Sequence, residues 1–342
     1  RRSLIMTLFN YKNPLLIAEI SGNHNQSKTR FLKLIDTAFK NGADIVKIQT
    51  YEPKDITLNI KNKKFKITNG VWKNKYLWDL YKKAHTPFNW HKPAFNIAKK
   101  HKKILFSSPF SKRGVDLLER FNVKIYKIAS FEITDLKLIN YIASKKKPII
   151  ISTGMSSIKE VKKAIKEINK FHNKIIILHC VSNYPTNLKD VNLSRIKQLK
   201  KVFKNYKIGL SDHTNDIYSS IAAYTHGVVA IEKHFNLDNK KTTDSAFSIT
   251  PNKLKLLSQI LKDLSAKPEK NKKININMIK LRRSIFASND IKKNAVFNIK
   301  NIETYRPKIG LCASNYFKII GKKSKKNIKK GFPIFKEFVS NH

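Results

Sequence analysis

The stretch GLSDHTNDIYSSIAAYTHGVVAIEKHF, residues 209–235, contains a strand–helix–strand unit. Its first apolar segment ends at Ser211-Asp212-His213, a helix-like segment follows, and a second apolar segment ends at Glu232-Lys233-His234. Gly227 stands where this helix is expected to stop, and Gly42 where an earlier helix is, because glycine readily adopts the backbone conformation that ends helices. The stretch therefore predicts two strands of one sheet, each finishing on a histidine. The two histidines are either unrelated residues at the rim of the sheet, or their rings face one site.

The same unit recurs along the chain. Short runs rich in β-branched residues have the length of strands that are buried on both faces. They occupy residues 15–20, 44–50, 104–109, 124–130, 148–154, 175–182, 207–212 and 228–235. Between them lie segments such as 28–43, 111–122 and 157–171, whose apolar residues recur at the three- and four-residue spacing of helices.

This alternation favours one fold class. Eight β–α units in roughly 240 residues predict an α/β fold, a TIM (β/α)8 barrel rather than an open Rossmann sheet. The sequence contains no G-x-G-x-x-G or G-x-x-x-x-G-K-[ST] motif, so nothing in it indicates a loop for nucleotide phosphates.

Length and composition limit the remaining possibilities. The chain has 342 residues, of which 41% are hydrophobic, enough for one large domain and a smaller one. Cys180 and Cys312 are its only cysteines, which argues against a disulfide framework or a structural zinc site and fits a reducing cytoplasm. No apolar run reaches the ~18 residues that span a bilayer. The first ten residues, RRSLIMTLFN, do not resemble a signal peptide.

The net charge of +47 raises the question of nucleic-acid binding. The surplus is mostly lysine, and lysine, asparagine and isoleucine are abundant together, as an AT-rich genome would produce on any solvated surface. RNA-binding proteins usually show arginine clusters or aromatic stacking motifs, and the sequence has neither. We therefore expect no specific nucleic-acid partner and no membrane association. An inactive barrel that binds partners through its basic surface remains the alternative of a different class.

Two segments interrupt the β–α alternation. Residues 51–103 are too long for a simple connection and predict a hairpin and a short helix that cover one end of the barrel, besides the helix before the third strand. Residues 265–277 are charged and lack an apolar period, which predicts a linker. The expected organisation is a barrel domain over 1–264 and a small β-rich domain over 278–342, which is marginal by itself.

In a TIM barrel the reactive groups lie at the carboxyl ends of the strands. Lysines with hydroxyl and amide groups suit a phosphate and a carboxylate, carboxylates can orient a hydroxyl or move a proton, and two neutral histidines are ordinary metal ligands. The polar residues at these ends are Glu19, Lys47, Gln49, Ser107, Ser108, Lys127, Ser130, Glu132, Ser152, Thr153, His179, Ser182, Ser211, His213, Lys233 and His234.

These residues differ in how strongly they indicate a site. Lys47 and Lys127 lie inside strands, where a buried cation needs a partner. Ser152 and Ser211 could equally cap the next helix. His179 is expected to pack in the barrel wall. Glu232 is expected to alternate outward and to be the weaker carboxylate.

A set of motifs identifies a family. IAEISGNHNQ, GADIVKIQT, FSSPF, YKIASFE, IISTGM, YPT, GLSDHT and IEKHF occur in this order, and YRP with a following glycine lies near the end. Together they resemble the sialic acid synthase family along essentially the whole chain. The resemblance implies a TIM barrel followed by a C-terminal antifreeze-like (SAF) domain. It also implies condensation of phosphoenolpyruvate with an N-acetylated amino sugar to give a nine-carbon acidic sugar. The 51–103 insert resembles the pseudaminic acid synthase branch, with the N-acetylneuraminate and legionaminate branches as alternatives.

The resemblance also implies roles. Glu19, Glu132 and Lys127 are expected to be catalytic, and Tyr184 to pack on the sugar. His213 and His234 are expected to hold a divalent cation, Mn²⁺, Mg²⁺ or Co²⁺. The expected substrate-binding residues are Lys47, Gln49, Ser108, Ser130, Ser152, Ser182, Tyr184, Ser211 and Arg306.

Two serines depart from the family pattern, and one arginine implies a partner chain. Ser108 stands where the family often has threonine, and Ser182 replaces an asparagine of the neuraminate branch. A homodimer is implied, in which the C-terminal domain docks on the partner's barrel and Arg306 meets the acylamino group of the sugar.

Overall fold

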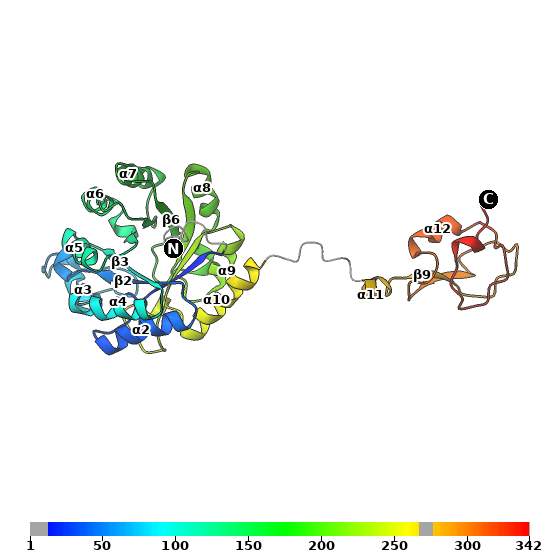
Figure 1. Cartoon of the computed structure of the whole chain (residues 1–342), viewed down its shortest axis with the longest axis horizontal. Helices are drawn as coiled ribbons and strands as arrows, with labels where there is room; N and C mark the ends of the chain where they lie inside the picture. The colour runs from blue at the N-terminus through cyan, green and yellow to red at the C-terminus, as the bar shows by residue number, and fades with distance from the viewer. Residues whose placement is uncertain (1–12, 267–275, 342) are drawn as a thin grey trace. The chain divides into compact units, whose positions relative to one another are not determined.

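The computed structural model describes residues 13–266 and 276–341 (Figure 1). The chain divides into two compact units, 1–266 and 267–342, and each is described by itself. The segment RRSLIMTLFN and residues 267–275 of the predicted linker lie outside the described residues.

The first unit contains a closed barrel of eight parallel strands in the order β1 to β8, as predicted. Its last strand pairs with its first, so that Glu19 lies opposite His234. Each strand lies within the range expected from its β-branched run. The strands are β1 Leu15–Glu19, β2 Ile45–Thr50, β3 Ile104–Pro109, β4 Tyr126–Ile128, β5 Ile149–Ser152, β6 Ile175–Cys180, β7 Lys207–Asp212 and β8 Ala230–His234.

Helices surround the barrel (Figure 1). The α2 helix begins after Ser27, whose side chain accepts a hydrogen bond from the backbone of Arg30, and its apolar face is buried. Gly42 and Gly227 have φ values of +97° and +65°, so both predicted helix stops are confirmed. The helices of this layer are α2 Lys28–Lys40, α4 His91–Lys100, α5 Lys112–Arg120, α6 Leu136–Ala143, α7 Ile158–Asn169, α8 Ser194–Val202, α9 Tyr218–Thr225 and α10 Pro251–Ser265.

The barrel core has two layers. Outward-facing strand residues pack against the helices, whereas Leu15, Ile17, Phe106 and Leu178 belong to a separate apolar cluster inside the barrel. Because side chains alternate along a strand, the next inward positions beyond this cluster lie toward the carboxyl ends. The apolar cluster therefore closes the barrel from below and leaves a polar pocket above it.

The insert between β2 and α4 folds as predicted, into a hairpin and a short helix. Lys66 pairs antiparallel with Tyr76 across the hairpin. At its tip, Trp72 Nε1 donates to the carbonyl oxygen of Thr243 at 2.9 Å, so the hairpin lies against the loop that follows β8. The regular elements of the insert are the 3₁₀ turns η1 Pro53–Asp55, η2 Lys63–Phe65 and η3 Phe88–Trp90 and the helix α3 Leu77–Ala84. Three further turns follow β4, β6 and β8: η4 Ser130–Glu132, η5 Leu188–Asp190 and η6 Ser245–Phe247.

The second unit is small and β-rich. Strands β9 Ser284–Ala287 and β10 Ile302–Tyr305 form an antiparallel pair. Ile285, Phe297, Ile302 and Ile334 belong to its own apolar core. Arg306 directly follows β10 and is exposed. The remaining elements are α11 Ile276–Ile279, η7 Ala313–Asn315, α12 Tyr316–Ile319 and η8 Lys336–Phe338. Across the described ranges of both units, no helix combines the length and apolarity needed to cross a membrane.

Candidate active site

A pocket of about 640 Å³ opens at the carboxyl end of the barrel, a size typical of small-molecule sites. It brings together every barrel residue that the sequence assigned to substrate, catalysis or metal. These are Glu19, Lys47, Gln49, Ser108, Lys127, Ser130, Glu132, Ser152, Ser182, Tyr184, Ser211, His213 and His234. The other strand-end candidates lie outside the lining, namely Ser107, Thr153, His179 and Lys233. Arg306 belongs to the second unit.

Lys47 lies between two buried carboxylates. Its Nζ atom is 3.3 Å from Glu19 and 3.0 Å from Glu232. Glu19 also accepts a hydrogen bond from Gln49 at 3.0 Å, and Ser211 donates to Glu232 at 2.9 Å. Burial alone would lower the pKa of Lys47, but the two carboxylates outweigh burial and raise it. Lys47 is therefore a permanent cation at the centre of the pocket.

The prediction that Glu232 points outward is wrong. Its side chain lies inside the barrel, and the residue is 3% exposed. Burial would raise the pKa of Glu232, yet Lys47 and then Lys127 outweigh it and lower the pKa to about 2. The orientation of Glu232 was predictable from the sequence, because side chains two residues apart in a strand share a face. Once His234 is assigned to the pocket, Glu232 must point there as well.

Lys127 has a different environment. Its buried Nζ atom donates to Ser152 Oγ at 2.6 Å and to the carbonyl oxygen of Ile128 at 3.0 Å. No carboxylate of residues 13–266 or 276–341 forms an ion pair with it. Burial lowers the pKa of Lys127 to about 8, with Glu232 opposing the shift. A buried cation without its own carboxylate is well suited to an anionic ligand.

Hydroxyl groups extend this anion-binding side over β3 to β6. Ser130 Oγ accepts a hydrogen bond from the backbone of Gly154 at 3.0 Å. A Cβ atom on Gly154 would lie 2.0 Å from Ser182 Oγ and 2.9 Å from Ser130 Oγ, so only glycine allows both hydroxyls to approach. The hydroxyls of Ser108 and Ser182 are buried and make no hydrogen bond to a described residue. Buried hydroxyls normally have a partner, which indicates that they serve a ligand.

The opposite side of the pocket carries oxygen acceptors. Asp244, in the loop after β8, accepts hydrogen bonds from the Ser21 hydroxyl and, at 3.0 Å, from the backbone of Gly22. Burial raises the pKa of this carboxyl group. With Glu19 and Gln49, Asp244 lines the β8–β1–β2 side of the pocket. The sequence prediction missed Asp244, because it lies well beyond the end of its strand.

Aromatic side chains form the outer wall of the pocket. The Tyr184 ring lies 5.4 Å from that of Trp72 and 5.0 Å from that of Phe247, measured between ring centroids. All three residues line the pocket. Only Tyr184 was predicted, since Trp72 and Phe247 arrive from the insert and from the loop after β8. Such a wall suits the apolar face of a sugar.

Glu132 lies in η4, directly after β4. Burial raises its pKa to about 7, and Lys127 partly opposes the shift. Its Oε2 atom is buried and makes no hydrogen bond within the described ranges. A carboxyl group that titrates near neutral pH can both donate and accept a proton. Burial also raises the pKa of Glu19 to about 7, but Glu19 forms an ion pair with Lys47, so Glu132 is the freer of the two carboxyl groups to act as a general acid or base.

Replacing Glu132 with glutamine should change how stability depends on pH. The folded-state pKa of about 7 exceeds the ordinary 4.5, so this group's stabilising contribution is complete below about pH 4.5 and is lost as the pH rises through about 7. At ~1.4 kcal/mol per pKa unit, the loss amounts to up to about 3 kcal/mol. We expect the free energy of unfolding of Glu132→Gln, relative to the wild type, to increase from about pH 5 to about pH 8. Urea denaturation at both pH values measures it, and parallel pH curves would contradict the prediction.

His213 and His234 lie side by side at the pocket, with ring centroids 5.2 Å apart. The Nδ1 atom of His213 is 2.8 Å from the carbonyl oxygen of Val181, so Nδ1 carries the proton and Nε2 keeps its lone pair. Burial, followed by the nearby His213, lowers the pKa of His234 and keeps its ring neutral. Burial would lower the pKa of His213, but Cys180 outweighs burial and raises it. In their neutral forms the two imidazoles fit a divalent cation. Within the described ranges, no group of three or more histidine, cysteine or acidic residues could hold a metal ion, so a cation bound by these two rings would have no third ligand of these types there.

Comparisons with known proteins place this pocket in context. The model described as "NeuB family" matches residues 34–273, and the model described as "SAF domain" matches residues 282–340. The pseudaminic acid synthase of Helicobacter pylori is 40% identical over 328 residues, covering 94% of this chain and 96% of that protein. The N,N'-diacetyllegionaminic acid synthase of Campylobacter jejuni is 36% identical over 330 residues, covering 93% and 98%. The crystal structure of the N-acetylneuraminic acid synthetase of Leptospira borgpetersenii, in complex with citrate, superposes with a TM-score of 0.67 and 29% identity, covering 78% of this chain and 91% of that one.

Proposed function

The chain belongs to the NeuB family, and we propose that within it the chain acts as a pseudaminic acid synthase. The proposed reaction joins phosphoenolpyruvate, 2,4-diacetamido-2,4,6-trideoxy-altrose and water to give pseudaminate and phosphate. The observation that carries the proposal is the division of one pocket into an anion-binding side and an acceptor-lined side.

Phosphoenolpyruvate fits the anion-binding side. This ligand carries a phosphate and a carboxylate and has no hydrogen-bond donor when it is fully ionised. Lys47 and Lys127 supply charge, and serine hydroxyls of β3 to β6 supply further donors. Ser152 already holds the Lys127 ammonium at 2.6 Å, so the cation is positioned before the ligand arrives.

The sugar fits the other side. Its hydroxyl and acetamido N–H groups are donors, and Glu19, Gln49 and Asp244 present oxygen acceptors. Trp72 and Phe247 add an apolar surface for the methyl groups of a deoxy sugar with two acetamido substituents. The similarity to pseudaminic acid synthases, somewhat higher than to the legionaminic acid synthase, favours the altrose derivative.

The reaction follows from these positions. The C3 carbon of phosphoenolpyruvate attacks the aldehyde carbon of the open-chain sugar, and positive charge develops at C2. Water adds at C2, and the tetrahedral intermediate breaks its C2–O bond and releases phosphate. Glu132 takes the proton of the attacking water and passes it to the alkoxide formed from the aldehyde oxygen, and the C2 hydroxyl gives its proton to the departing phosphate as the C2 ketone forms. Lys127 stabilises the charge on that phosphate. A divalent cation held by His213 and His234 would supply Lewis-acid polarisation of the aldehyde.

We propose further that the enzyme is a cytoplasmic homodimer in which the second unit of each chain covers the partner's pocket. Apolar side chains are exposed on the β→α connections and at the first residue of α9, where a monomer would leave them in water. They are Leu58, Val71, Phe131, Met155, Leu188 and Tyr218. The second unit exposes Tyr305, Ile309, Phe317 and Phe332. Among the described residues, Cys180 and Cys312 are free thiols, as is usual in a reducing compartment.

Arg306 should act across this dimer. Its forked guanidinium suits the carbonyl of an acylamino group, so Arg306→Ala and Lys127→Ala should each be nearly inactive. In a mixed dimer of the two variants, one pocket has both an intact Lys127 and an intact Arg306 only if Arg306 comes from the partner chain. We therefore expect activity of verified heterodimers to return to about a quarter to a half of the wild-type level, as one intact site in two allows. Heterodimers without activity would reject the trans arrangement, and an active Arg306→Ala would reject the role.

Phosphate release tests the proposed function directly. Wild-type protein is assayed with phosphoenolpyruvate, added Mn²⁺ and one of three sugars: the altrose derivative, N-acetylmannosamine or the legionaminate precursor. The highest kcat/KM is expected for the altrose derivative. A higher value for another sugar would support the alternative synthases. No phosphate from any sugar would support an inactive barrel that binds through its basic surface.

A further inference from the structure

The loop after β8 contributes three residues to the pocket, although it contains no long helix or strand. Thr243, Asp244 and Phe247 line the pocket, and the loop's only regular element is η6. Its ends are closed by a parallel bridge between Phe235 and Ile249. The stretch between them therefore depends on other parts of the barrel to hold its shape.

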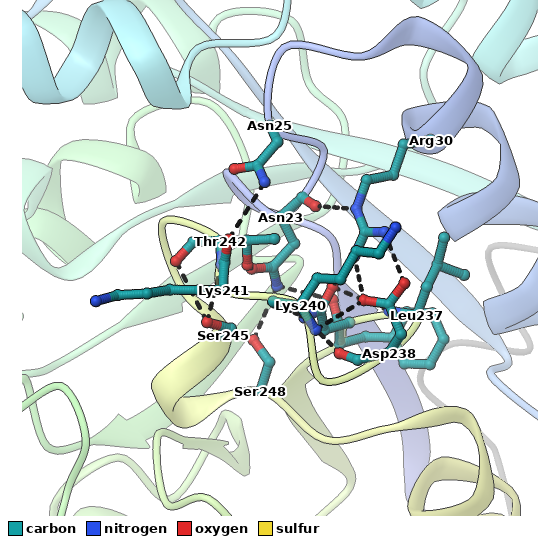
Figure 2. Close-up of polar contacts among 12 residues, drawn as sticks. Asn23, Asn25, Arg30, Leu237, Asp238, Lys240, Lys241, Thr242, Ser245 and Ser248 are labelled. Atoms are coloured by element: carbon teal, nitrogen blue, oxygen red, sulfur yellow. Dashed lines mark hydrogen bonds and ion pairs between the residues drawn. The ribbon is translucent and has the colours of Figure 1, made fainter.

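Arg30 holds the first part of this loop. From α2 it donates Nε to the carbonyl oxygen of Asn23 at 2.9 Å and Nη2 to Asn236 Oδ1 at 2.7 Å. Its Nη1 and Nη2 atoms donate to the two carboxylate oxygens of Asp238 at 3.0 and 2.9 Å (Figure 2). The arginine side chain is only 15% exposed. Such a forked, partly buried pair fixes orientation as well as charge.

Asn23 holds both ends of the same loop. Its buried Nδ2 atom donates to the carbonyl oxygen of Phe235 and to Ser248 Oγ, each at 2.8 Å, and its Oδ1 atom accepts from Thr242 at 2.5 Å (Figure 2). Since Arg30 in turn binds the backbone of Asn23, the two residues form one connected network. We call Arg30, Asn23, Asn236 and Asp238 the Arg30 clamp.

The clamp acts on the acceptor-lined side of the pocket. Asp244 lies between the clamped segments and accepts from Ser21 and Gly22, which immediately precede Asn23. Thr243 receives the Trp72 hydrogen bond. A shift of the loop would therefore move an acceptor and the aromatic wall together, while the anion-binding side on β3 to β6 would keep its contacts.

We propose that Arg30 is a positioning residue that determines affinity for the sugar but not for phosphoenolpyruvate. Arg30 does not line the pocket, so it acts through the loop from 236 to 248. The inference rests on the proposed function, because it assigns the sugar to the β8–β1–β2 side. Displacements of ~1 Å in a group that orients substrate can reduce turnover ~100-fold, which makes a clamp of this kind a determinant of specificity.

The chain offers a matched control. Lys147 and Glu119 form an ion pair of 2.5 Å, with side chains 21% and 33% exposed. Arg30 and Asp238 are comparable, at 15% and 40%. Lys147 precedes β5, at the amino end of the strands and opposite the pocket. Arg30→Gln and Lys147→Gln therefore remove similar ion pairs at opposite ends of one barrel.

The test compares Arg30→Gln, Arg30→Lys and Lys147→Gln with the wild type by steady-state kinetics. Arg30→Gln should raise the KM for the sugar about tenfold or more and change the KM for phosphoenolpyruvate less than about twofold. Arg30→Lys keeps the charge but not the fork, so its sugar KM should be intermediate. Lys147→Gln should leave both KM values unchanged. Arg30→Lys also provides the answer if Arg30→Gln does not fold.

Hydrogen exchange supplies a readout that needs no substrate. Amides of residues 236–248 should exchange faster in the Arg30 variants than in Lys147→Gln or the wild type. Unchanged exchange there, equal effects of Arg30 and Lys147 substitutions on the sugar KM, or a parallel rise of both KM values in Arg30→Gln would each overturn the proposal. Wild-type protein that releases no phosphate with any sugar contradicts the proposed function instead, and the exchange comparison still decides whether Arg30 holds the loop.

Discussion

Replacing Lys127 with methionine should lower kcat/KM for phosphoenolpyruvate by about 10²–10³-fold, corresponding to roughly 3–4 kcal/mol of lost charge-assisted contact. Lys127 has no carboxylate partner among the described residues, and its Nζ atom is held at 2.6 Å from Ser152 on the anion-binding side. Its charge is therefore available to the phosphate, both in the bound substrate and as the C2–O bond breaks. Steady-state kinetics with each substrate varied in turn should show a higher KM for phosphoenolpyruvate and a lower kcat, with little change in sugar binding.

The stability of this variant separates a ligand-binding lysine from a structural one. Burial lowers the pKa of Lys127 to about 8, which means that the folded protein holds this charge at a cost. Methionine of similar length should leave the thermal midpoint unchanged or raise it. Lys47→Met should instead destabilise the protein by about 3–5 kcal/mol, because it leaves Glu19 and Glu232 buried without their cation. Wild-type kinetics for phosphoenolpyruvate in both variants would show that the pocket has been assigned wrongly.

The barrel was predictable because its strands are buried on both faces. Continuous β-branched runs identify such strands without any alignment, and glycines such as Gly42 and Gly227 mark where helices stop. The alternation of side chains along each strand then indicates which residues face the pocket and which face outward. On β8, Glu232 and His234 face the pocket, whereas Lys233 faces outward and pairs with Asp212 at 3.0 Å. Because alternate residues of a strand share a face, the position of His234 in the pocket would have assigned Glu232 to the pocket and Lys233 to the outside.

Residues supplied by long connections could not be predicted in this way. Asp244, Trp72 and Phe247 line the pocket, yet no periodicity reaches them from the nearest strand. Their positions depend on tertiary contacts, such as the Trp72 hydrogen bond to Thr243 and the ties that Asn23 makes to the same loop. A sequence pattern reports local structure, so the acceptor-lined side of the pocket became visible only in the folded chain.

Most of the lysines that give the chain its positive charge lie on the surface. Of the lysines that the structure describes, only Lys47, Lys127 and Lys233 are buried. Two of these line the pocket, and the third forms an ion pair with Asp212 in the barrel wall. The remaining described lysines are at least partly exposed, as expected of a solvated surface. The lysine charge that matters to the proposed reaction is thus confined, among the described residues, to Lys47 and Lys127.

Removing divalent metal should abolish activity altogether, and Mn²⁺, Mg²⁺ or Co²⁺ should restore it. In its neutral form His213 keeps its Nε2 lone pair, because Nδ1 donates to Val181 at 2.8 Å, and the neighbouring ring of His234 stays neutral. Each neutral ring can donate a lone pair to a cation, and the loss of either would leave one histidine to hold it. His234→Ala should weaken metal binding by about tenfold or more. Titration calorimetry with Mn²⁺ measures the affinity independently of turnover.

A histidine on the neighbouring strand provides the control for this experiment. His179 in β6 is buried, but its Nε2 atom lies 2.7 Å from the carbonyl oxygen of Val191 and it does not line the pocket. His179→Gln should therefore keep the wild-type Mn²⁺ affinity, although it also replaces a buried imidazole. If His179→Gln and His234→Ala weaken Mn²⁺ binding equally, the effect comes from a disturbed barrel wall and not from a lost ligand. Full activity of the wild type after exhaustive chelation would exclude a metal from the reaction, and the two rings would then serve the substrate directly.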